Sequence, residues 1–162
     1  MKVELKAALR KLAKAVVVVT AKHDGVRYAM SATAVSEISL DPPTMLVCIN
    51  RTASIHPAVS GSGLFCLNIL HHSDQEIAQL CGGGARGEDR FNVGEWIDTP
   101  SGCPRLANAE AAVVCEVVQS MSVGTHDIVV GEVQAVHLSQ TAEPLIYVDG
   151  RYTQALAVQL AG

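Results

Sequence analysis

The sequence is short of aromatic and charged residues. Of its 162 residues, 4% are aromatic and 17% are charged, whereas 49% are hydrophobic. In an average protein about a quarter of the residues are charged. The apolar volume therefore comes mainly from Val, Ala, Leu and Ile, and this surplus indicates a subunit interface or an enclosed ligand. A chain with this much apolar content is not expected to be disordered.

The chain also lacks the marks of nucleic-acid-binding, membrane and secreted proteins. It has 12 Lys and Arg against 16 Asp and Glu, a net charge of -4, and no basic stripe. No apolar run approaches the ~20 residues of a membrane helix, and the N-terminus has no signal-peptide core. The 5 cysteines form no C-x-x-C pair, which indicates reduced, buried thiols. We therefore expect one cytoplasmic domain over residues 1–162.

The apolar periodicity predicts many strands and three short helices. Helices are expected over residues 2–14, 55–60 and 74–81, with Ser54 capping the second and a Ser73–Glu76 capping box on the third. Strand patterns cover residues 15–20, 27–31, 33–40, 44–50, 64–70, 111–122, 126–138, 145–148 and 152–154. Residues 82–108 show no regular period. Because helices and strands do not alternate, the pattern favours an antiparallel barrel with peripheral helices.

Several familiar motifs carry little weight here. The pattern G-x-G-x-x-G at Gly82–Gly87 follows a helix and not a strand, so it indicates a helix end and a loop more than a dinucleotide site. His71 and His72 are adjacent, and adjacent strand residues point to opposite faces, so we expect no shared metal ion. The sequence contains no G-x-S-x-G elbow or reactive-cysteine signature that would indicate a nucleophile.

Three segments have groups suited to a ligand. Residues 29–36 are small or hydroxylic, so a flat ring or a phosphate could approach their backbone, although a tightly packed strand has the same composition. Residues 47–54 lead into a helix start that could hold an anion, although an unliganded capped helix is commoner. His126 lies at a turn, where one ring nitrogen could face a ligand, although most turn histidines are ordinary surface residues.

Taken together, these segments resemble the short-chain flavin reductases, the reductase components of two-component, flavin-dependent monooxygenases. The similarity spans roughly residues 8–153 and rests on the order of nine short motifs. These are VVVT at 17–20, ATAVS at 32–36, DPP at 41–43, VCIN at 47–50, FCLNIL at 65–70, RF at 90–91, GCPRL at 102–106, GTHD at 124–127 and GRY at 150–152. The variants look like those of reductases that serve hydroxyphenylacetate hydroxylases and the pyrimidine-ring-opening pathway.

The resemblance implies a fold and an activity. The fold is mainly β with short helices, a split β-barrel that binds FMN, or sometimes FAD, and forms a homodimer. The activity is that of an NAD(P)H:flavin oxidoreductase, which passes hydride from NADH or NADPH to flavin and supplies reduced flavin to a separate monooxygenase. Two alternatives stay open. One is an FMN-containing reductase of another acceptor, such as a metal complex, and the other is a flavin- or haem-binding barrel without reductase activity.

The resemblance also implies roles for individual residues. His126, the candidate catalytic residue, would lie beside the nicotinamide, with Tyr152 near the same pocket. Arg90 and Phe91 would form a basic–aromatic pair near the flavin phosphate. The flavin ring, ribityl chain and phosphate would contact residues of the first two segments: Met30, Ser31, Ala32, Thr33, Ala34, Val35, Cys48, Ile49, Asn50 and Ser54. No residue is predicted to bind a metal.

Overall fold

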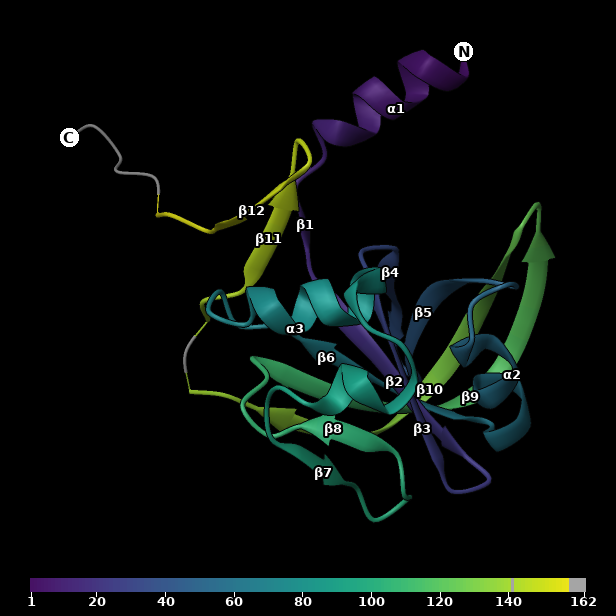
Figure 1. Cartoon of the computed structure of the whole chain (residues 1–162). Helices are drawn as coiled ribbons and strands as arrows, with labels where there is room; N and C mark the ends of the chain where they lie inside the picture. Colours follow the sequence, from purple (N-terminus) through teal and green to yellow (C-terminus); the bar gives the residue numbers. More distant parts are fainter. Residues whose placement is uncertain (141, 158–162) are drawn as a thin grey trace.

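The computed structural model describes residues 1–140 and 142–157, in which strands predominate (Figure 1). The helical elements are α1 (Lys2–Arg10), α2 (Ile55–Ser62), α3 (Gln75–Gln79), the π-helical η1 (Leu80–Gly84) and the 3-10 helix η2 (Gly87–Phe91). The strands are β1 (Lys14–Ala15), β2 (Val17–His23), β3 (Val26–Ala32), β4 (Val35–Leu40), β5 (Pro43–Asn50), β6 (Leu64–Ile69), β7 (Trp96–Asp98), β8 (Pro104–Leu106), β9 (Ala111–Val123), β10 (His126–Leu138), β11 (Leu145–Val148) and β12 (Arg151–Gln154). Among the described residues, no helix has the length and apolar character to cross a bilayer.

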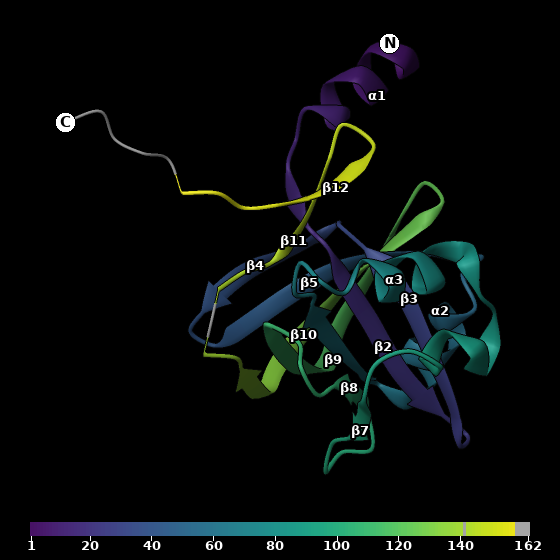
Figure 2. The ribbon, with the colours of Figure 1, turned by 60° about the vertical axis from the view of Figure 1, so that its left-hand side comes forward.

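The strands form one large sheet and two small ones. The seven-stranded sheet has the order β3-β2-β6-β9-β10-β5-β4, and β1-β11-β12 and β7-β8 are separate. Every pair is antiparallel. The β1-β11-β12 sheet and α1 extend from one end of the large sheet (Figure 2). The expected mainly β fold with short helices is confirmed.

The large sheet curls because its two edge strands are neighbours in the chain. β3 and β4 lie at opposite edges of the sheet, yet only Thr33 and Ala34 separate them. Each residue spans at most about 3.6 Å, so the sheet must bend until its edges meet at this end. The Ala34 carbonyl accepts a hydrogen bond from the Cys48 amide at 2.9 Å. β3 and β4 are not paired with each other, which leaves the barrel split along this line.

Alternate residues of β2 face two different cores, because successive strand residues point to opposite sides. Val19 joins an inner cluster with Ile49 and Phe65, drawn from the large sheet and from α2. Val18 joins an outer cluster with Leu106, which α3, η1, η2 and β8 cover. This burial on both faces explains why the apolar residues 16–19 follow one another without a polar residue between them.

A buried amide attaches the β7–β8 hairpin to the large sheet. Asn68 of β6 donates through Nδ2 to the Val18 carbonyl at 2.9 Å, and its Oδ1 accepts from the Leu106 amide at 2.7 Å. Thr20 donates to the Pro104 carbonyl beside it. The polar groups are hydrogen-bonded, as burial requires.

The structure differs from the expected elements in three places. Within residues 82–108 it forms η2, β7 and β8, whose three to five residues are too few to show a period. α1 ends at Arg10 and buries none of its residues. The predicted capping box is wrong, because Asp74 is the N-cap of α3, without a side-chain cap bond. The Ser73 hydroxyl instead lies 2.8 Å from Nδ1 of His71.

The strand argument against a His71–His72 pair is also wrong. β6 ends at Ile69, so both histidines lie beyond the strand, where the alternation of faces no longer applies. Their ring centroids are 4.1 Å apart. The two imidazoles therefore share one side of the chain.

Candidate active site

An open groove lies at the connection between β3 and β4, where the two edges of the large sheet come together. Its volume is ≈ 560 Å³, within the range of small-molecule sites. Four of the predicted site residues line it, namely Thr33, Ala34, Val35 and Cys48. The chain from Leu12 to Ala15 forms another wall. A neighbouring cavity of ≈ 400 Å³ shares Leu12, Lys14 and Thr33, and it adds Lys6 and Arg10 from α1.

The segment between β5 and α2 forms a compact turn that ends in a helix start. The Asn50 side-chain oxygen accepts hydrogen bonds from the backbone amide and the hydroxyl of Thr52, both at 3.0 Å. Ser54 is the N-cap of α2, as predicted, but its hydroxyl makes no capping hydrogen bond. Ser54 is exposed. An exposed hydroxyl at the positive end of a helix suits an anion such as a phosphate.

This turn is fastened to the β9–β10 turn that carries His126. Arg51 donates from its guanidinium to the Gly124 carbonyl at 2.6 Å and from its backbone amide to the Thr125 carbonyl at 3.1 Å. His126 pairs with Asn50 across β10 and β5. The imidazole is exposed, and its Nδ1 lies 2.9 Å from the Thr125 hydroxyl. The structure thus brings together two predicted segments that are far apart in sequence.

Asp127, which the sequence analysis did not single out, holds this junction from the other side of β10. One carboxylate oxygen lies 2.7 Å from Nε2 of His56 in α2, and the other accepts from the Ser122 hydroxyl at 2.7 Å. These two hydrogen bonds, first that of His56, lower the pKa of Asp127 below its ordinary value. Strand alternation could have revealed this residue, since Asp127 must point away from the face that carries His126.

Arg90 and Phe91 lie away from the groove. Arg90 donates to the carbonyls of Ala85 and Ala29, which fastens the loop before η2 onto β3. Phe91 is 7% exposed in the outer core. Its ring meets Trp96 edge-on, and the Arg27 guanidinium lies 4.3 Å from its centroid. Both residues therefore contact β3, Arg90 through the Ala29 carbonyl and Phe91 through the side chain of Arg27, and help to hold it in place.

The side chains of several other predicted residues face the protein interior. Ile49 is 0% exposed, so only its backbone could reach a ligand. Met30 and Ala32 pack against the inner core. Ser31 is turned to the opposite side and donates to the Ala78 carbonyl of α3 at 2.7 Å.

Tyr152 and His126 are not brought together within one chain. Tyr152 lies on β12 of the three-stranded sheet, with its ring 5.2 Å from that of Tyr147. It lines a small cavity with His72 and Gln75. His126 begins β10 in the large sheet, and the β9–β10 turn and the β11–β12 hairpin extend on different sides of the body (Figure 1). The described residues of this chain therefore do not form the expected shared pocket.

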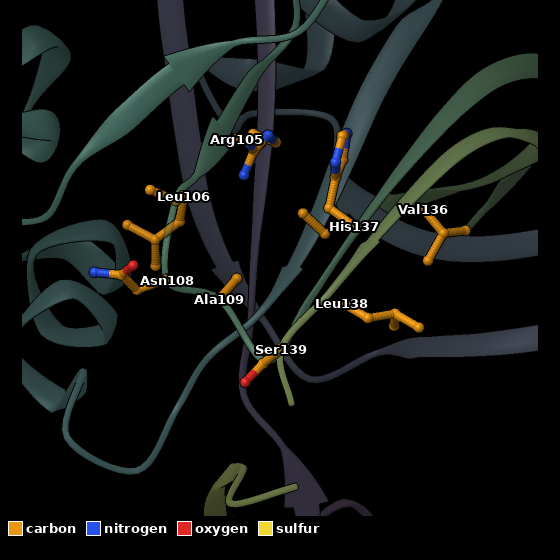
Figure 3. Close-up of a pocket in the computed structure, with 10 residues that line it drawn as sticks. Arg105, Leu106, Asn108, Ala109, Val136, His137, Leu138 and Ser139 are labelled. Atoms are coloured by element: carbon orange, nitrogen blue, oxygen red, sulfur yellow. The ribbon is translucent and has the colours of Figure 1, made fainter. Parts of the chain in front are cut away.

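Figure 3 shows a further cavity, of ≈ 580 Å³, which sequence reasoning did not indicate. It lies between the chain that follows β8 and the end of β10, and Arg105, Asn108 and His137 are among its lining residues. Nε2 of His137 is buried without a hydrogen-bond partner among the described residues. None of the predicted site residues lines this cavity, so we place the candidate site at the β3–β4 groove.

Comparisons with known proteins identify the family to which the chain belongs. The family model described as "Flavin reductase like domain" matches residues 9–156. The FMN reductase (NADH) RutF of Variovorax paradoxus is 36% identical over 156 residues, which cover 96% of this chain and 87% of that protein. A flavin reductase domain protein from Arthrobacter sp. FB24 has a TM-score of 0.90 at 25% identity and covers 99% of both chains. BorF, the flavin reductase component of a bacterial two-component tryptophan halogenase, has a TM-score of 0.87 at 26% identity, over 95% of this chain and 98% of BorF. The chain therefore belongs to the flavin reductase family.

Proposed function

We propose that this chain is an NADH:FMN oxidoreductase that supplies reduced flavin to a separate monooxygenase. The observation that carries the proposal is the 36% identity to an FMN reductase (NADH) over 96% of the chain. The likeness to BorF, a component of a two-component system, supports release of reduced flavin to a partner enzyme. FAD and NADPH remain alternative substrates to be compared with FMN and NADH.

The residues around the groove fit a flavin mononucleotide. Short side chains such as Ala15, Thr33 and Ala34 line it, so a flat ring can approach the backbone closely. The exposed Ser54 hydroxyl, without a capping bond, is available to the phosphate at the start of α2. Bound flavin supplies the chemistry, as the acceptor of a hydride from the nicotinamide.

The chain's own residues bind and orient the reactants. Hydride transfer needs the two rings stacked, and it requires little acid–base machinery from the protein. We assign His126 to positioning the nicotinamide, because its imidazole is exposed beside the segment that would hold the flavin phosphate. Arg51 bonds the turn between β5 and α2 to the β9–β10 turn that carries His126, and Asp127 bonds β10 to α2, so the relative position of the two turns is fixed.

The exposed apolar face of α1 supports a homodimer. Leu5 and Leu9 of α1 are 58% and 50% exposed, Leu12 just after the helix is 53% exposed, and α1 has no buried residue. Single exposed leucines are common, whereas an apolar stripe along a helix marks an interaction surface. Because Leu12 also lines the groove, a second subunit that packs on α1 would enclose the flavin site.

We propose that residues 1–162 form a single domain. The free thiols support a cytoplasmic location for it. All five cysteines are unpaired, and four of them are buried. Burial raises the pKa of Cys81 to about 11 and the pKa values of Cys103 and Cys115 to about 12. These neutral thiols act as small apolar side chains of the core and not as nucleophiles or metal ligands.

The function is tested by following NADH oxidation with FMN, FAD and riboflavin in turn. We expect rapid, flavin-dependent oxidation with FMN, and flavin that is lost from the protein on gel filtration. Failure of all three flavins, with either NADH or NADPH, would overturn the proposal. Flavin that stays bound while a metal complex is reduced would instead identify the alternative reductase.

Replacing His126 by alanine is expected to raise the KM for NADH about 10-fold, with a much smaller effect on the KM for FMN. The reason is that the imidazole would contact the nicotinamide and not the flavin phosphate. Steady-state kinetics with each substrate varied in turn measures both constants. The control is His23→Ala, which removes a histidine of the β2–β3 hairpin. An unchanged KM for NADH in His126→Ala would contradict the assignment.

Replacing Ser54 by aspartate is expected to raise the KM for FMN at least about 10-fold through repulsion of the phosphate. Aspartate is as good an N-cap residue as serine, so α2 should be preserved. Riboflavin, which has no phosphate, should show little change. Ser60→Asp, near the other end of α2, is the matched control. Equal losses with FMN and riboflavin would show that Ser54 does not bind the phosphate.

The double substitution Leu5→Lys and Leu9→Lys is expected to convert a dimer to a monomer at micromolar concentration. Since α1 buries nothing in one subunit, the substituted chain should still fold, which circular dichroism checks. Light scattering coupled to gel filtration gives the mass, and Lys2→Gln on the same helix is the control. A wild-type monomer would refute the dimer, and a dimeric double variant would exclude α1 from its interface.

A further inference from the structure

We infer that His71, His72 and Glu143, together with Glu110, form a binding site for a transition-metal ion such as Zn²⁺. One ligand atom from each of His71, His72 and Glu143 lies within 4.8 Å of the others. Nε2 of His71 is 3.4 Å from Oε2 of Glu143 and 3.8 Å from Oε1 of Glu110. Two imidazoles and two carboxylates are a donor set that suits Zn²⁺.

Glu110 is an independent sign that a cation belongs at this site. Its side chain is 7% exposed, and its Oε2 atom has no hydrogen-bond partner among the residues that the structure describes. A buried carboxylate oxygen is normally paired, because leaving it unpaired is costly. Its other oxygen faces Nε2 of His71, so the carboxylate is directed toward the cluster.

The distances suit a shared metal ion better than a shared proton. Charge-assisted hydrogen bonds between nitrogen and a carboxylate are about 2.7–2.9 Å long, shorter than both His71–Glu separations. Ligands about 2.0–2.1 Å from a tetrahedral zinc ion lie about 3.4 Å from one another. The separation of 3.4 Å between His71 and Glu143 matches that edge. Glu143, which is exposed, can rotate to close the remaining gap.

The surrounding contacts orient the ligands. Nδ1 of His71 accepts a hydrogen bond from the Ser73 amide at 3.2 Å and lies 2.8 Å from the Ser73 hydroxyl, and these contacts hold the imidazole with its Nε2 facing Glu143 and Glu110. His72 donates its amide to the Glu143 carbonyl at 2.9 Å, and His71 and Pro144 form an isolated bridge. These bonds hold the backbones of the ligands together without a metal.

The location assigns the ion a structural role. The ligands come from three segments: the connection from β6 to α3, the residue before β9, and the approach to β11. A bound ion would cross-link the large sheet to the β1-β11-β12 sheet, whose Tyr152 lines a cavity with His72. His71, His72 and Glu143 supply three clustered ligands. Glu110, whose Oε1 lies 3.8 Å from Nε2 of His71, would move closer as the fourth ligand and close the site, as in structural zinc sites.

The test uses tag-free protein that has been stripped with a chelator and dialysed. Titration calorimetry with ZnCl₂ is expected to show one ion per chain, and zinc should raise the melting temperature. Glu143→Gln and His72→Gln should each weaken binding at least about 10-fold. Asp24→Asn is the matched control, since Asp24 is an exposed carboxylate 3.5 Å from the imidazole of His23.

Cobalt substitution gives a second readout that does not depend on activity. Bound Co²⁺ should show the visible absorption of a tetrahedral site without a thiolate charge-transfer band. Both variants change exposed or half-buried side chains, and circular dichroism confirms that they fold. The absence of saturable zinc binding by the wild type, or equal affinities of wild type and Glu143→Gln, would overturn the inference.

Discussion

The link of two residues between β3 and β4 is the constraint on which the remaining architecture depends. A flat seven-stranded sheet would place its edges far apart, and Thr33 with Ala34 cannot span such a distance. The sheet therefore curls, the inner core fills with side chains from its strands and from α2, and an unpaired seam remains. The candidate groove lies at the end of this seam, where Thr33 and Ala34 themselves line it. The position of the candidate site thus follows from the incomplete closure of the barrel.

The second half of the site depends on hydrogen bonds between two turns. Arg51 bonds the turn after β5 to the carbonyls of the β9–β10 turn, and Asp127 bonds β10 to α2 and β9. Most of these contacts involve backbone carbonyls or short side chains, which leave His126 and Ser54 exposed. A rigid frame around exposed polar groups is what binding two substrates in a fixed relation requires.

The sequence predicted the long elements well, because burial imposes a strong pattern on them. Strands β9 and β10, the turn at Gly124 and the N-cap Ser54 agree with the expected positions. Strands β7 and β8 have three residues each, too few for any period. The capping box failed because the side chain of Ser73 has a competing partner in His71. Local patterns do not reveal such long-range or competing contacts.

The candidate site residues were harder to predict, because a short motif does not show whether a residue contacts a ligand or stabilises the fold. Asn68 and Phe91 belong to the motifs that carry the resemblance, yet one anchors β8 and the other packs in the outer core. Thr33 and Cys48, from equally short motifs, line the groove. Only the direction of each side chain separates these two kinds of residue, and direction depends on the curl of the sheet.

The apolar surplus of the sequence has two sources, the two cores of the barrel and the exposed leucines at the N-terminus. The inner and outer clusters absorb the Val, Ala and Leu residues of the barrel, and they leave α1 outside with its leucines exposed. Leu12 follows α1 and lines the groove. A subunit that covers α1 would therefore remove apolar surface from water and shape the flavin site in the same step. Subunit association and substrate binding would then stabilise each other, since each would order the same wall of the groove.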